Sequence, residues 1–116
     1  DVAWARYADL RLWPRWAPQI RAVEAPQRRL RAGLRGVVHA PLGLRVPFVV
    51  EEVDDDARTW RWTVRVAGTA VSMTHDLTAT PRGTRAGLTV HGPAVVALAY
   101  RLPARVALRR LCRAHL

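Results

Sequence analysis

Apolar and polar residues alternate along six segments of the chain from residue 20 onward. The clearest segment is 59–67, where Trp60, Trp62 and Val64 alternate with Arg61 and Thr63. A repeat of two residues is typical of a β-strand with one buried face. The same reasoning predicts strands over residues 20–24, 34–40, 44–53, 59–67, 70–79 and 84–91.

Turn-forming residues separate the expected strands. Ala32-Gly33, Asp54-Asp55-Asp56 and Pro81-Arg82-Gly83 each stand between two alternating segments. Connections this short join antiparallel neighbours, because a parallel crossover needs a dozen or more residues. We therefore expect one antiparallel meander.

Helices are expected at both ends of the chain. Residues 1–12 place apolar side chains at helical spacing, and Trp13-Pro14-Arg15-Trp16 suits a further short turn. Residues 93–116 also read as helical, but their apolar stripe changes phase at Pro103. Because a proline inside a helix kinks it, we expect an α+β protein whose C-terminal helix bends near Pro103.

Length and composition favour a single domain over residues 1–116. A chain of this size has room for one hydrophobic core, and 50% of its residues are hydrophobic. No apolar run approaches the roughly 20 residues of a membrane-spanning helix, and no signal-peptide pattern is present. The lone Cys112 cannot form an internal disulfide. These features predict a cytoplasmic protein.

The formal charge of +10 comes entirely from arginine, since the chain contains no lysine. This bias is typical of coding in a GC-rich bacterial genome. Nucleic-acid sites usually gather basic residues on one element, whereas here the arginines spread from Arg6 to Arg113. Their spread argues against a nucleic-acid partner, while contact with an anionic membrane surface stays open.

Several short motifs follow one another in the order seen in a known superfamily. Ala8-Asp9 and Trp13-Pro14-Arg15-Trp16 precede the first expected strand, Trp60-Arg61-Trp62 lies on the fourth, and Gly83-Thr84-Arg85 opens the last. In this order the chain resembles the START-like (SRPBCC) superfamily, and within it the polyketide cyclase/dehydrase and lipid-transport group. Members usually start with a strand ahead of the first helix. That strand is missing here, through truncation or true loss, and a true loss would leave the last strand with an unpaired edge.

The resemblance implies a helix-grip fold, in which a curved sheet of about six strands wraps the C-terminal helix around a cavity. Members of the superfamily bind lipids, quinones, polyketides or hormones there, and a minority catalyse cyclisation or dehydration. The residues expected to line the cavity are Trp13, Phe48, Val50, Glu52, Trp60, Trp62, Met73, His75, Leu88, Leu98 and Leu102.

His75 is the main candidate for chemistry. It shares an inward face with Met73 and Leu77, and a buried imidazole needs a hydrogen-bond partner, for which Glu52 is the candidate. One interpretation is a structural histidine whose hydrogen bonds are satisfied in the core. The other is a hydrogen-bond donor or acid–base group that acts on a bound carbonyl.

No pattern in the sequence indicates a metal or a cofactor. The acidic residues between positions 51 and 56 lack the spacing of a calcium loop and fit a solvated hairpin tip instead. His39, His91 and His115 are scattered, and neither a serine-hydrolase elbow nor a phosphate-binding loop is present. We expect neither a metal nor a cofactor.

Three functions fit these observations. The first is binding or transport of a hydrophobic small molecule such as a lipid, quinone or polyketide. The second is an aromatase/cyclase or dehydratase that acts on a polyketide-like substrate with His75. The third is a basic interaction protein that docks on RNA, the ribosome or an anionic membrane.

Overall fold

A computed structural model of the chain describes residues 2–17, 19–66, 68–92 and 104–113. Six strands form one antiparallel sheet in the order β1-β2-β3-β4-β5-β6, so the expected meander is confirmed. The strands are β1 (Ala22–Glu24), β2 (Arg35–His39), β3 (Arg45–Asp54), β4 (Thr59–Val66), β5 (Thr69–Thr80) and β6 (Gly83–His91). Each lies close to the bounds that alternation predicts.

The N-terminal helix is shorter than expected. The helix observed is α1 (Val2–Ala8). It is followed by a 3₁₀ turn, η1 (Leu10–Leu12), and by a short helix, α2 (Trp13–Trp16). Asp9 interrupts the helix because its backbone is extended (φ −105°, ψ 106°) and its side chain accepts a hydrogen bond from the backbone N–H of Arg11. The prediction of a continuous helix over residues 1–12 was wrong, because this aspartate caps a new turn instead of extending the old one.

Two further helical pieces complete the described structure. The 3₁₀ turn η2 (Pro41–Gly43) links β2 to β3, and residues 104–111 form a helix. The expected bend at Pro103, and the expected helix over residues 93–103, fall outside the described residues. None of the described helices is long and apolar enough to span a membrane.

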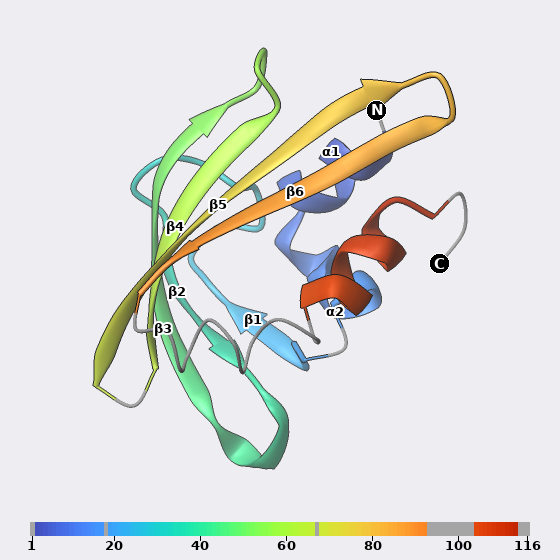
Figure 1. Ribbon diagram of the computed structural model, residues 1–116. Coiled ribbons are helices and arrows are strands. Elements are labelled where there is room, and N and C mark those ends of the chain that lie inside the picture. Colours follow the sequence, from blue (N-terminus) through green and yellow to red (C-terminus); the bar gives the residue numbers. More distant parts are fainter. Residues whose placement is uncertain (1, 18, 67, 93–103, 114–116) are drawn as a thin grey trace.

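The sheet is strongly curved, and the helices gather on its concave side (Figure 1). The concave face supplies Trp60 and Trp62 to the core, where they are 2% and 5% exposed. Tyr7 and Trp13 pack against them from the helical layer, and Leu111 joins them from the C-terminal helix. The core therefore lies between the sheet and the helices.

Arg6 fastens α1 to the end of the C-terminal helix. Its buried guanidinium donates hydrogen bonds through Nη1 to the carbonyl oxygens of Arg110 (3.2 Å), Leu111 (2.6 Å) and Arg113 (2.5 Å). A positive charge is favourable at the C-terminal end of a helix, where unpaired carbonyl groups point outward. This contact helps to hold the helix of residues 104–111 on the concave face.

A bulge in β3 changes which side chains face the core. Val50 pairs with Trp62, but Glu52 pairs with Arg61, so one extra residue lies between the two pairs. Beyond the bulge Glu52 points away from the core, and it forms an ion pair with Arg61 at 3.2 Å. The prediction that Glu52 faces the cavity was wrong, because a bulge breaks the strict alternation on which it depended.

Candidate functional site

A pocket of about 220 Å³ opens on the concave face of the sheet. Among the described residues its walls are apolar except for Gln19. They come from the segment after α2 and from five strands or their ends. The described lining consists of Gln19, Ile20, Val38, Ala40, Leu44, Val46, Trp62, Val64, Val66, Val71, Met73 and Val90.

Side-chain size along β4 explains where this space lies. The inward face of β4 carries two tryptophans, Trp60 and Trp62, followed by two valines, Val64 and Val66. The indole rings fill the space beneath the helices, whereas the valines are too short to do so. Val71 pairs with Val64 across the strands, so short side chains meet at this end of the sheet and leave the pocket open.

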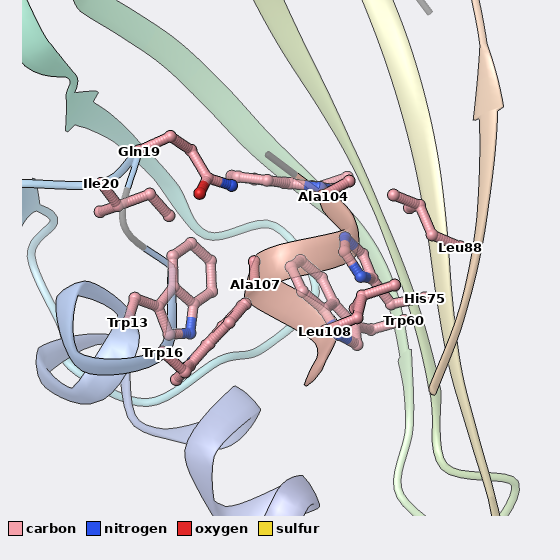
Figure 2. Close-up of a pocket in the computed structure, with 11 residues that line it drawn as sticks. Trp13, Trp16, Gln19, Ile20, Trp60, His75, Leu88, Ala104, Ala107 and Leu108 are labelled. Atoms are coloured by element: carbon pink, nitrogen blue, oxygen red, sulfur yellow. The ribbon is translucent and has the colours of Figure 1, made fainter. Parts of the chain in front are cut away.

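A second cavity of about 20 Å³ adjoins the first, since both are lined by Gln19, Ile20 and Trp62. Figure 2 shows side chains from three parts of the fold converging on it. The sequence after Leu12 contributes four of them, the strands contribute four, and the C-terminal helix contributes three. In this order they are Trp13, Trp16, Gln19 and Ile20; Trp60, Trp62, His75 and Leu88; and Ala104, Ala107 and Leu108.

His75 lies at this small cavity and is 5% exposed. Its ring stacks on Trp60, with the centroids 4.4 Å apart and the planes 7° from parallel. Its Nδ1 lies 3.2 Å from the hydroxyl oxygen of Tyr7, while its Nε2 has no hydrogen-bond partner among the described residues. Burial lowers the pKa of His75 to about 3, because desolvation disfavours the charged imidazolium. At neutral pH the site therefore holds a neutral imidazole.

The structure brings together six of the eleven residues expected to line a cavity. Trp13, Trp60, His75 and Leu88 line the small cavity, Met73 lines the large one, and Trp62 lines both. Of the other five, three lie elsewhere and two fall outside the described residues.

Three of those five have described positions. Phe48 and Val50 are buried in the core but line neither cavity, and Glu52 lies on the outer face. Leu98 and Leu102 fall outside the described residues, so their predicted role is a proposal still to be tested.

Sequence reasoning missed the partner of His75. Tyr7 is 68 positions away in the chain, and helical spacing placed it only among the apolar residues of the expected N-terminal helix. It also missed the valine wall of the larger pocket, although the descending side-chain size from Trp60 to Val66 was visible in the sequence. That gradient is the signal that could have located the empty space.

Charged groups lie away from both cavities in the described part of the structure. Asp54 ends β3 and Asp55 follows it in the turn before β4; both are exposed, and Asp55 accepts a hydrogen bond from Trp4 Nε1 at 3.0 Å. Burial raises the pKa of the Cys112 thiol, which makes it a weak nucleophile. No group of three metal-binding side chains occurs in residues 2–17, 19–66, 68–92 and 104–113.

The whole chain, residues 1–116, matches the family described as polyketide cyclase / dehydrase and lipid transport. The chain belongs to this family. Its membership accounts for the helix-grip architecture, since the superfamily resemblance of the motifs already implied a sheet wrapped around a C-terminal helix. A comparison with curated protein sequences gives no match.

Two solved structures share the fold of this family member. Ara h 8.0201 superposes with a TM-score of 0.70 and 16% identity, over 95% of this chain and 85% of its own. Protein CV1439 from Chromobacterium violaceum superposes with a TM-score of 0.69 and 16% identity, over 95% of this chain and 84% of its own. Both comparisons confirm the helix-grip fold.

Proposed function

We propose that this protein binds an uncharged, largely apolar small molecule in the pocket on the concave face of its sheet. The observation that carries the proposal is a space of about 220 Å³ whose described walls are apolar except for Gln19. An engineered apolar cavity of roughly 150 Å³ in another protein stays dry and binds benzene. A pocket larger than this accommodates a correspondingly larger apolar guest.

The energetics favour such a guest. Transfer of apolar surface out of water is favourable by about 25 cal/mol per Å², and a preformed pocket adds little ordering cost. Pairs such as Val64 and Val71 offer contact area without polar groups that would have to be desolvated. The family description, which includes lipid transport, agrees with a ligand of this class.

Acid–base catalysis receives less support than binding. A general acid or base works best when its pKa lies near the operating pH, whereas burial lowers the pKa of His75 to about 3. His75 is therefore poorly suited to accept a proton at neutral pH, although a neutral imidazole still forms hydrogen bonds. We infer that carriage or sequestration of a ligand describes this site better than cyclisation or dehydration.

Titration with the uncharged fluorophore N-phenyl-1-naphthylamine tests this proposal. Val64→Phe places a phenyl ring in the pocket and is expected to weaken binding at least about tenfold, which corresponds to 1.4 kcal/mol. Val49→Phe is the matched control, because Val49 pairs with Thr63 on the opposite face of the same sheet. If the wild-type protein takes up no probe, or both variants bind equally well, the proposal fails.

A specific feature favours membrane contact as a second role. Leu42 at the tip between β2 and β3 is fully exposed, and Leu44, which also lines the pocket, is 51% exposed. An apolar tip beside a pocket mouth on a protein of charge +10 suits contact with an anionic bilayer. Co-sedimentation with vesicles containing anionic lipid tests this role. Leu42→Ser should reduce the bound fraction, and an unchanged fraction would reject the contact.

A further inference from the structure

The five tryptophans of this chain differ in what their indole N–H groups do. Three donate to the protein: Trp4 to Asp55 Oδ1 at 3.0 Å, Trp13 to the Tyr7 carbonyl at 2.9 Å, and Trp16 to the Arg6 carbonyl at 3.2 Å. The remaining two, on Trp60 and Trp62, are buried and have no partner among the described residues. Buried polar groups in folded proteins nearly always have a partner, so the two exceptions require an explanation.

The two unpartnered indole N–H groups belong to residues that lie beside a third buried polar atom without a partner. The Nε2 atom of His75 is likewise buried and unpartnered. The ring centroids of Trp60 and Trp62 lie 4.4 Å and 6.3 Å from that of His75. All three residues line the cavity of about 20 Å³. A cavity needs roughly 10–15 Å³ of this kind of volume to hold one water molecule, so there is room for a single oxygen atom.

The chemistry of these three groups limits what that atom can be. An indole N–H only donates a hydrogen bond, so two of the three groups require an acceptor. The third, on a neutral imidazole, donates or accepts according to its tautomer. No charged side chain is among the described residues that line either cavity, so nothing there compensates a charged ligand group. An uncharged oxygen, as in a carbonyl or a hydroxyl group, meets these requirements.

We propose that the ligand is an apolar molecule with one uncharged carbonyl or hydroxyl oxygen, which binds in the small cavity beside Trp60, Trp62 and His75. The apolar body then extends past Trp62, which lines both cavities, into the space bounded by Val64 and Val71. This inference rests on the proposed binding function and adds the ligand's polar group and its orientation.

A matched pair of probes, naphthalene and 2-naphthol, tests the oxygen site. The two differ by one hydroxyl group, and the greater solubility of 2-naphthol in water by itself weakens its binding. We expect 2-naphthol to bind the wild-type protein about tenfold more tightly nonetheless, because it satisfies donors that naphthalene leaves unpaired. Isothermal titration calorimetry measures both affinities.

The indole N–H signals in ¹H–¹⁵N NMR spectra report where the oxygen lies. We expect 2-naphthol to shift the Trp60 and Trp62 indole signals clearly more than naphthalene does. The signals of Trp4, Trp13 and Trp16 should differ little between the probes, since these groups already have protein partners. Because the measurement uses the wild-type chain, it does not depend on the folding of a variant.

Two variants complete the test. Trp62→Phe removes one free donor and should reduce the preference for 2-naphthol several-fold, whereas Trp4→Phe, which removes an internally bonded donor, should retain it. Equal affinities for the two probes, with equal shifts of all five indole signals, would overturn the oxygen site and leave the proposed binding function intact. Failure of both probes to bind would overturn the binding function as well.

Discussion

Acidification should destabilise this protein through His75 in particular. Burial lowers the pKa of His75 from 6.5 to about 3, so the folded state takes up this proton at a lower pH than the unfolded chain does. The stability associated with the neutral ring is therefore fully present above about pH 6.5 and is lost as the pH falls toward 3. One pKa unit corresponds to about 1.4 kcal/mol, so lowering the pH from 7 to 5 should cost about 2 kcal/mol at this residue.

Urea unfolding followed by circular dichroism at pH 7, 6 and 5 measures this effect. His75→Phe keeps a ring in the core but cannot be protonated there, so its free energy of unfolding should fall less steeply with pH. The comparison of slopes cancels the contribution of the carboxylates, which are present in both proteins. Between pH 7 and pH 5 we expect the free energy of unfolding to fall by about 2 kcal/mol more in the wild-type protein than in His75→Phe.

His91→Gln controls for the general effect of removing a histidine, because His91 is exposed at the end of β6. Parallel pH profiles for the wild-type protein and His75→Phe would refute the reasoning. They would mean that His75 is solvated, or that its proton finds a partner in the folded state. Either result would also contradict the burial of the His75 ring in the core.

Three further predictions concern stability. Gly36→Ala should destabilise the protein by about 1–3 kcal/mol in thermal unfolding, because a Cβ atom there would overlap the carbonyl oxygen of Glu24; an unchanged melting temperature would contradict this. Leu42→Gly should change the free energy of unfolding by less than about 1 kcal/mol. Glycine relieves the strain of the left-handed conformation (φ 67°) at this exposed position, but it also loses more backbone entropy on folding; a large loss of stability would show that the Leu42 side chain packs against the rest of the protein. Arg6→Met should accelerate amide exchange across residues 104–111 and lower the free energy of unfolding by about 1–3 kcal/mol. Unchanged protection there would contradict a stabilising role for the hydrogen bonds of Arg6.

The strands were predictable from sequence because each exposes one face and buries the other. The alternation around Trp60 and Trp62 fixed both the element and the direction of its side chains. The same rule failed at Glu52, since a bulge arises from how two strands pair and leaves no mark in the pattern of either one. Helical spacing failed in turn at Asp9, where a side-chain hydrogen bond caps a new turn although the apolar spacing continues.

The candidate site was predictable only in part. The inward position of His75 followed from its neighbours on β5, but its contact with Tyr7 joins residues far apart in the chain. Which indole N–H groups find partners depends on the distance of each ring from particular carbonyl groups, and periodicity does not contain that information. The size of the pocket likewise depends on sheet curvature, although the change from tryptophan to valine along β4 indicated its place.

A crystal structure of the protein grown with 2-bromonaphthalene tests the central claim most directly, because the anomalous signal of bromine locates the guest without ambiguity. We expect a single strong bromine peak on the concave face, within contact distance of Val64, Val71 and Val90. Side chains that fill this space, or bromine found only on the outer surface, would contradict the existence of a ligand pocket in this protein.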